Sequence, residues 1–418
     1  MSERYYDVAV IGAGPAGLAA AASAKESGAE KVVVIERDFR PGGILEQCIH
    51  AGFGLKYFGE ELAGPEYATR FIERCEQNGI EFMVNTMVLD IDGTKRTIHA
   101  VHKDGMVTIK AGAIVLAMGC RERTRAQIQI PGDRPAGIYT AGAAQRFCNV
   151  QNHIVGNEIV IVGSGDIGMI MARRMTLEGA KVKGVFEIMS YLAGLNRNRV
   201  QCLDDFGIPL YLDHTVVKIH GKKRVEKVTV AKVDERKRPI PGTEFDVECD
   251  TVLLSVGLIP ENEVSKTAGV ELDPITKGPI VDNTMMTSVQ GIFACGNVVH
   301  VNDLVDNVSR ESEIAGAAAA AFASDSKGHD ARLKVSPGNL VRYVVPQYVD
   351  PASQEEVKMY FRVTKPMRNV YIEAKSGDKV LYRRKKQFVN PGEMETIGVK
   401  KADLSEGIGD SITVSIAE

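Results

Sequence analysis

The cysteines of this chain are too scattered to form a pattern. The 418 residues contain seven of them, an odd number, and no two are spaced as Cys-x-x-Cys. Neither a disulfide framework nor a zinc or iron–sulfur ligand set is visible, so we expect no metal site. The simplest interpretation of each cysteine is a buried thiol.

An excess of charge of either sign is also missing, as is any long hydrophobic run. Lys and Arg total 51 against 54 Asp and Glu, which gives no reason to expect nucleic acid or an anionic membrane as partner. The longest run of small residues, 315–321, is too short and too weakly apolar to span a bilayer, and no signal peptide precedes the first apolar strand. We expect a cytoplasmic protein of about two to four domains, without an integral membrane segment.

What the chain does contain is one glycine fingerprint, present twice. Gly-x-Gly-x-x-Gly occupies residues 12–17 and again 163–168, each time after an apolar strand and at the start of a helix. An acidic residue ends the next strand of each unit, Glu36 in the first and Glu187 in the second. Every position of the second copy lies 151 residues after its counterpart in the first. The repeat therefore covers a whole strand-helix-strand unit.

Each feature of the fingerprint has a physical reason. The first glycine allows a tight turn, the second lets the backbone approach a diphosphate, and the third lets the helix pack closely on the strand. The helix N-terminus offers unpaired N–H groups and its positive dipole end to the phosphates, and the carboxylate accepts hydrogen bonds from ribose hydroxyls. A single fingerprint is often only a glycine-rich turn. Two fingerprints whose residues all recur at the same offset predict two dinucleotide sites, and therefore two cofactors.

The remaining pattern gives the order of domains. Each unit is closed by an apolar strand that ends at a glycine, at 113–119 and at 251–257, and a third such strand at 291–297 leads into a helix rich in small residues. We expect an α/β fold with two Rossmann-like dinucleotide-binding domains, the second inserted in the first, and a small C-terminal all-β module. Helices are predicted at about 65–78 and 303–324, a linker at 324–338, and short strands from 341 to 416. The predicted domains are 1–122 together with 278–328, then 150–258, and finally 337–418.

The order of these motifs, with Pro-Gly-Gly at 41–43 and Gly-Ile-Phe-Ala-Cys-Gly-Asn at 291–297, resembles the two-dinucleotide-binding flavoproteins of the thioredoxin-reductase and glutathione-reductase class. The resemblance covers about residues 5 to 327. It implies FAD in the first unit, completed by the strand at 291–297, and a nicotinamide dinucleotide in the second. In most relatives the residue at Asn297 is Asp, which bonds a ribityl hydroxyl of FAD. Asn can accept there and also donate.

The motifs assign cofactor binding to a set of residues that lie at the two fingerprints, at the ends of the strands, and after the Pro-Gly-Gly turn. They are Gly12, Gly14, Pro15, Ala16, Gly17, Glu36, Arg37, Gly43, Gly119, Gly163, Gly165, Asp166, Ile167, Gly168, Glu187, Gly257, Gly296 and Asn297.

Residues 42–55 together with 294–306 are similar to a narrower bacterial branch of NAD- and FAD-dependent oxidoreductases. Its members are often encoded beside a glycerol-3-phosphate-dehydrogenase-like flavoprotein. More distant relatives are the electron-transferring subunits of hydrogen cyanide synthase, opine oxidase and dye-linked proline dehydrogenases, which commonly carry a cysteine-rich iron–sulfur segment. This chain has no cysteine after Cys295, so that segment is absent.

Cys48 and His50 follow the Pro-Gly-Gly turn and are the candidate catalytic residues. In disulfide reductases of this class a Cys-x-x-x-x-Cys pair relays two electrons at this point, but here only Cys48 occurs, so thioredoxin- or glutathione-type disulfide exchange is not expected. Cys48 is a structural thiol near the flavin, a single redox thiol cycling through sulfenic acid, or a contact for substrate or partner. His50 either protonates a flavin-bound acceptor or is a hydrogen-bonded residue of the flavin wall.

The second cofactor is predicted to be NAD(H) rather than NADP(H). Glu187 would repel a 2′-phosphate, and no arginine follows it at once. We expect an oxidoreductase that exchanges electrons between NAD(H) and a second redox subunit, and whose β module binds that subunit or a second copy of the chain. The alternatives are a stand-alone reductase of a peroxide or small organic acceptor that uses Cys48 and His50, and a non-catalytic sensor or scaffold that holds FAD.

Overall fold

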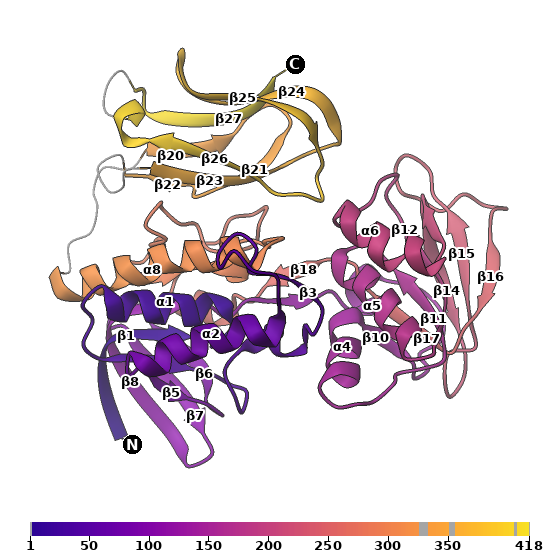
Figure 1. Cartoon of the computed structure of the whole chain (residues 1–418), viewed down its shortest axis with the longest axis horizontal. Helices are drawn as coiled ribbons and strands as arrows, with labels where there is room; N and C mark the ends of the chain where they lie inside the picture. Colours follow the sequence, from indigo (N-terminus) through magenta and orange to yellow (C-terminus); the bar gives the residue numbers. More distant parts are fainter. Residues whose placement is uncertain (1, 326–332, 351–355, 405–407, 418) are drawn as a thin grey trace. The chain divides into compact units, whose positions relative to one another are not determined.

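The structure, a computed structural model, describes residues 2–325, 333–350, 356–404 and 408–417 (Figure 1). The chain divides into two compact units. The first combines Met1–Cys120 with Pro260–Glu418, and the second is Arg121–Ile259. One unit is thus inserted in the other.

The first unit is built on a mixed sheet whose parallel strands carry the first fingerprint. These strands run in the order β5, β2, β1, β8, β19, and two antiparallel strands, β7 and β6, continue the sheet from the other half of β8. The carboxyl ends of the parallel strands meet at one edge, where ligands bind in sheets of this kind. The strands are β1 (Ser2–Ile11), β2 (Val32–Ile35), β5 (Glu81–Met83), β6 (Met87–Asp92), β7 (Thr97–His102), β8 (Gly105–Leu116) and β19 (Ile292–Ala294).

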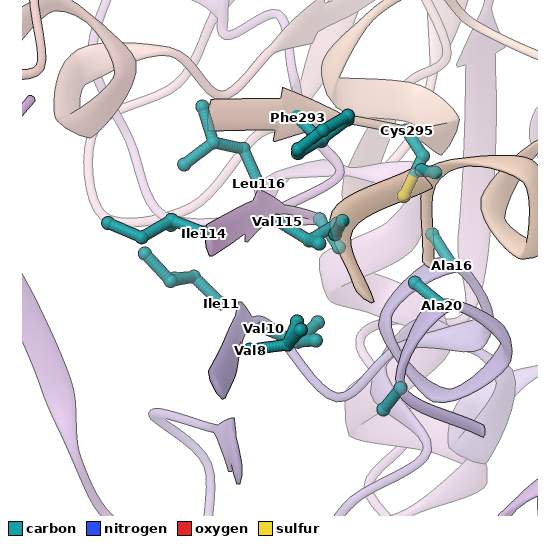
Figure 2. Packing of buried hydrophobic residues seen from close by; sticks show 14 of the residues in the cluster. Val8, Val10, Ile11, Ala16, Ala20, Ile114, Val115, Leu116, Phe293 and Cys295 are labelled. Carbon is teal, nitrogen blue, oxygen red and sulfur yellow. The ribbon is translucent and has the colours of Figure 1, made fainter. Parts of the chain in front are cut away.

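Helices α1 (Pro15–Glu26) and α8 (Val305–Asp325) lie side by side on this sheet, and α2 (Gly64–Gln77) packs against α1 (Figure 1). The near-continuous apolar strands are buried on both faces, as expected for parallel strands covered by helices. Figure 2 shows Val8 and Val10 of β1 and Val115 of β8 packed with Ala16 and Ala20 of α1. Gly316 of α8 lies so close to α1 that a side chain there would overlap the carbonyl oxygen of Ala20.

The second unit repeats the parallel arrangement. Its five-stranded sheet has the order β10, β17, β11, β12, β13, and β11 occupies the place that β1 has in the first unit. A separate antiparallel sheet follows in the chain. The elements are β10 (Ile138–Thr140), α4 (Ala141–Asn149), β11 (Glu158–Val162), α5 (Asp166–Leu177), β12 (Lys181–Glu187), α6 (Asn196–Cys202), β13 (Leu210–Leu212), β14 (His214–His220), β15 (Lys227–Lys232), β16 (Phe245–Glu248) and β17 (Thr251–Leu254).

The C-terminal part of the first unit is an all-β module of two sheets with a shared apolar core. One sheet has the order β22, β20, β27, β24, β25, and the other β21, β23, β26. The strands are β20 (Leu333–Pro337), β21 (Val341–Val345), β22 (Tyr348–Val349), β23 (Glu356–Val363), β24 (Met367–Ser376), β25 (Lys379–Val389), β26 (Glu395–Lys400) and β27 (Ser411–Ala417).

The predicted fold class is confirmed, and the predicted helices agree within two residues with α2 and α8. The predicted linker at 324–338 is wrong for 324–325, which end α8, and for 333–337, which form β20 and pair with β22 and β27. Residues 326–332 lie outside the described part. The short elements of the two units are β3 (Ala51–Phe53), β4 (Leu62–Ala63), β9 (Cys120–Glu122), α3 (Arg125–Ile128), β18 (Leu258–Pro260) and α7 (Glu263–Thr267).

Candidate functional site

The first fingerprint forms the turn between β1 and α1, at the carboxyl edge of the sheet. Gly12 has φ +102°, and a side chain on Gly17 would overlap the carbonyl oxygen of Gly12. Packing within the protein therefore requires these two glycines. Gly14 differs, because a Cβ built on it meets nothing within 4 Å. Only a group outside the chain that approaches this backbone closely would require glycine at position 14.

The helix that follows is suited to an anion. Gly14 is the N-cap of α1 and Pro15 stands at its start, while no side chain caps the helix and no acidic residue occupies its first turn. Its first N–H groups are thus left for a ligand. The Pro-Gly-Gly turn lies against the same backbone, since Gly42 N donates to Ala13 O at 2.8 Å and a Cβ on Gly43 would come within 2.7 Å of Gly14 Cα. These residues fit a dinucleotide diphosphate.

The second fingerprint has the same turn but a more enclosed surrounding. A side chain on Gly163 would overlap the carbonyl oxygen of Ser255, and a Cβ on Gly168 would lie 2.7 Å from Ser255 Cβ. A Cβ on Gly165 would lie 3.0 Å from Ser255 Oγ, and that hydroxyl accepts a hydrogen bond from Gly168 N at 3.1 Å. Ser255 therefore organises this turn. Its role was not predicted, although it lies near the end of 251–257. This segment is one of the three strand–glycine elements, the apolar strands at 113–119, 251–257 and 291–297 that each lead to a glycine.

Asp166 occupies the first turn of α5. Its carboxylate accepts hydrogen bonds from Leu195 N at 2.8 Å and from Asn198 Nδ2 at 2.6 Å. Asp166 thereby holds the segment that follows β12 near the second fingerprint. The role predicted for Asp166 and Ile167 in nucleotide binding stays a prediction.

The two acidic residues make the same contacts in both units. Glu36 accepts from Ala13 N at 2.7 Å and from Asp38 N at 2.8 Å. Glu187 accepts from Ser164 N at 2.8 Å and from Met189 N at 2.9 Å. Each carboxylate ties the fingerprint turn to the end of the next strand, a structural role that sequence reasoning missed. Because a carboxylate has about four acceptor positions, each retains capacity for the ribose contact that we predicted.

The strand–glycine elements bring further predicted residues to the same edges. Gly119 and Gly257 have positive φ, and a Cβ on either meets nothing closer than 3.8 Å. Gly296, with φ +70°, lies against α1, since a Cβ there would be 2.7 Å from Ala16 Cβ. The fingerprint turn of the first unit and the strand at 291–297 therefore meet in space, although about 280 residues separate them. Arg37, next to Glu36, is exposed.

The two polar side-chain atoms of Asn297 have different partners. Its Oδ1 accepts a hydrogen bond from Asn302 N at 2.9 Å, while its Nδ2 lies 3.8 Å from Cys120 Sγ. The acceptor atom thus fixes the local loop. Since Nδ2 donates one hydrogen to Cys120 Sγ, the ribityl contact predicted for Asn297 stays a prediction that would use the second amide N–H.

Cys48 follows a short 3-10 turn and is buried. Its carbonyl oxygen accepts from Gly64 N at 2.8 Å, and burial raises the pKa of its thiol to about 12. The thiol is therefore protonated at neutral pH. His50 lies at the surface of the same loop, with Nδ1 3.0 Å from Ala51 O and its ring 5.0 Å from that of Phe53. The catalytic roles of Cys48 and His50 stay predictions.

No disulfide joins any of the seven cysteines, all of which lie in the described part of the chain. The described residues contain no group of three or more His, Cys, Asp or Glu side chains placed to hold a metal ion. Among the described helices, none has the length and apolar character to cross a membrane.

A buried polar pair, Glu311 and His300, contacts the backbone of Gly296. Glu311 of α8 accepts a hydrogen bond from Gly296 N at 2.7 Å through Oε1, and its Oε2 lies 2.8 Å from His300 Nε2. Both side chains are 1% exposed. Glu311 was not recognised from the sequence, because it is one of several polar residues in the first half of α8 and no motif distinguishes it from the others.

The chain is similar to several known oxidoreductases. Thioredoxin reductase of Bacillus subtilis (strain 168) is 29% identical over 301 residues, which cover 71% of this chain and 87% of the relative. One of the subunits of opine oxidase from Rhizobium meliloti is 25% identical over 70% of this chain, and the match spans only 58% of that longer relative. The solved structure of T. acidophilum thioredoxin reductase superposes with a TM-score of 0.62 at 25% identity, covering 77% of this chain and 99% of that one.

Residues 6–334 match the model of the pyridine nucleotide-disulphide oxidoreductase family. The match covers both fingerprints and all three strand–glycine elements, and it confirms the resemblance that these motifs indicated. Membership implies FAD and a pyridine nucleotide as cofactors. The chain therefore belongs to the pyridine nucleotide-disulphide oxidoreductase family and is an oxidoreductase.

Proposed function

We propose that this chain is an FAD-dependent NAD(H) oxidoreductase that passes electrons between the nicotinamide and a second redox subunit. The partner is a dehydrogenase subunit of the glycerol-3-phosphate-dehydrogenase-like or the amine- and amino-acid-dehydrogenase-like kind. The observation that carries the proposal is the pair of repeated nucleotide-binding turns, combined with a single, deeply buried cysteine where a disulfide reductase needs two.

Residues at the carboxyl edge of the first sheet would hold FAD, in a domain formed by 1–122 and 278–328. Gly14 leaves room for the diphosphate beside the uncapped start of α1, and Gly43 and Gly296 pack against the same turn. Bound FAD supplies the two-electron chemistry with the nicotinamide. Domain 150–258 would hold the nicotinamide dinucleotide on Gly165 and the start of α5.

Glu187 supports NAD(H) over NADP(H). Its carboxylate is fixed at the end of β12 by the amides of Ser164 and Met189. A charge held in this position repels a 2′-phosphate, whereas it accepts hydrogen bonds from the ribose hydroxyls of NAD(H).

The environment of Cys48 supports transfer to a partner rather than to a thiol acceptor. A protonated thiol at neutral pH is a poor nucleophile towards peroxide or disulfide, and no second cysteine lies nearby in the sequence to resolve an oxidised form. We therefore favour a structural role for Cys48. The similarity to a protein named as one subunit of opine oxidase supports a multi-subunit arrangement.

The second candidate function is a stand-alone reductase of a peroxide or small organic acceptor at Cys48 and His50. It is favoured by one observation, the position of His50 at the surface of the loop that carries Cys48.

The experiment uses the purified full-length chain. Its flavin content is measured first, then bleaching of the flavin is followed anaerobically with NADH and with NADPH. The reduced protein is reoxidised with a purified dehydrogenase subunit of the proposed kind, or with hydrogen peroxide, for the wild type and for Cys48→Ser. The proposal expects bleaching by NADH, reoxidation by the partner, and the same behaviour in Cys48→Ser. If hydrogen peroxide reoxidises the reduced wild type but not reduced Cys48→Ser, the stand-alone function is established instead.

A further inference from the structure

The C-terminal β module shares its packing with the first nucleotide-binding domain. Tyr343 and Val345 of β21 belong to the apolar core of that domain, while Val341 and Val344 of the same strand belong to the core of the module. Backbone bonds reinforce the connection, since Gln347 N donates to Val281 O at 3.0 Å. The module is therefore continuous with the domain proposed to hold FAD.

The module also holds the loop that follows Gly296 and Asn297. Arg362 of β23 donates from Nη2 to the carboxylate of Asp303 and to Val301 O, the latter at 3.1 Å. Met394 N donates to the other oxygen of Asp303 at 2.6 Å. Arg362 and Asp303 are only 15% and 14% exposed, so the ion pair is largely screened from water.

His300, on the same loop, lies between the two parts. One of its ring nitrogens pairs with Glu311, whose other oxygen accepts Gly296 N. The ring of His300 lies 6.3 Å from the ring of Tyr343 and 5.7 Å from that of Tyr360, both supplied by the module. The loop 296–303 is thus bound on one side by α8 and on the other by β21 and β23.

A largely buried ion pair is a costly way to gain stability, because both charges lose most of their hydration. Its geometry, in contrast, is specific, since Arg362 reaches a carboxylate and a backbone carbonyl from one fixed guanidinium. An ion pair of this kind suits a loop that must keep one conformation. Asp303 precedes the N-terminus of α8, but capping of that helix does not account for its position, because both of its carboxylate oxygens are bound by the module.

We propose that Arg362 and Asp303 are positioning residues, through which the β module fixes the loop 296–303 in the conformation that binds FAD. This inference rests on the proposed FAD site at Gly296 and Asn297. It gives the module a part in forming the cofactor site, beyond the partner binding expected from the sequence.

The test compares the full-length wild type with Arg362→Met, Arg362→Lys, Asp303→Asn and the double variant Asp303→Asn/Arg362→Met. Arg383→Met is the matched control, since Arg383 lies on β25 of the same module and pairs with Glu373, but is 54% exposed. The dissociation constant of FAD is measured on the apoproteins, with the visible circular dichroism of the bound flavin, the KM for NADH at saturating FAD, and amide hydrogen exchange of residues 296–303.

We expect Arg362→Met and Asp303→Asn to weaken FAD binding about tenfold or more, because each leaves one partner of a buried pair unmatched. Exchange in the loop should accelerate and the flavin dichroism should change, while the KM for NADH stays within about twofold, since that nucleotide binds in the inserted unit. Arg362→Lys should retain part of the affinity, the double variant should lose less than the sum of the single losses, and Arg383→Met should match the wild type.

The inference is overturned if Arg362→Met binds FAD as the wild type does. It is also overturned if Arg383→Met loses as much affinity, because the effect would then be a general weakening of the module. Failure of the proposed function is distinct, since in that case the wild type itself would not bind FAD.

Discussion

The carboxylate of Glu187 accepts hydrogen bonds from both the backbone N–H and the hydroxyl of Ser164, each at 2.8 Å. Ser164 is the residue between the first two glycines of the second fingerprint, and Glu187 ends the following strand. The residue expected to select the nucleotide is therefore also part of the turn that we propose binds it. A test of selectivity must remove its charge while keeping at least one of its two oxygen acceptors.

Glu187→Gln should reduce the preference for NADH. The amide keeps an oxygen acceptor, but the negative charge that opposes a 2′-phosphate is gone, so we expect the ratio of kcat/KM for NADH to that for NADPH to fall about tenfold. Glu36→Gln makes the same change in the first repeat and should leave the ratio unaltered. Glu187→Ala should mainly unfold the turn, at a cost of about 1–3 kcal/mol for each amide left unpaired. An unchanged ratio in Glu187→Gln would remove the structural reason for choosing NAD(H).

Gly14→Val should abolish FAD binding without destabilising the apoprotein. A Cβ at this position meets no protein atom within 4 Å, so the side chain starts in open space, on the side proposed for the diphosphate. Flavin content and the thermal unfolding midpoint of the apoprotein measure the two effects. The counterpart in the second fingerprint is Gly165→Val, which should retain FAD but lose bleaching by NADH, although a Cβ there also lies 3.0 Å from Ser255 Oγ. Stoichiometric FAD in Gly14→Val would contradict the assignment of the first site.

Four thiols should make the protein less stable at high pH. Burial raises the pKa of Cys48, Cys75, Cys249 and Cys295 to about 12, above the value of about 8.5 for a thiol in an unfolded chain. The stability due to protonated thiols is full below about pH 8.5 and is lost as the pH rises towards 12. Urea unfolding at pH 7.5 and pH 10 should show the decrease.

The same burial predicts that iodoacetamide at pH 7.5 labels these four cysteines only after unfolding. Peptide mapping by mass spectrometry identifies the labelled sites. Rapid labelling of Cys48 in the folded protein would support the alternative in which Cys48 is a redox thiol.

Val345→Ala should destabilise the first nucleotide-binding domain, although Val345 belongs to a strand of the β module. Val345 is fully buried in the core of the first nucleotide-binding domain, so its truncation leaves a cavity there that costs about 2 kcal/mol. Val380→Ala, on an exposed position of β25, should change the free energy of unfolding by less than about 0.5 kcal/mol. Denaturant unfolding of the full-length chain compares the two. Equal effects would indicate that the module folds independently of the domain.

The local parts of this protein were predicted from its sequence because local constraints produce them. A turn that needs φ +102° at Gly12 and φ +93° at Gly163 requires glycine, and an apolar run that ends at such a turn is a strand buried under helices. The constant offset of 151 residues between the two fingerprints indicated that both units have the same arrangement of strands and helix. The order of the same motifs carries the resemblance to the family that the comparison confirmed.

The tertiary structure decided which side chains meet. The sequence contains no sign that Asp303 pairs with Arg362, 59 residues away, or that Tyr343 and Val345 leave their own module for the core of the neighbouring domain. Nor does it indicate that Glu311 would reach Gly296 N. These contacts join residues whose separation along the chain is unrelated to any local period. They form only when helices and sheets pack, because burial and charge pairing depend on what the fold brings together.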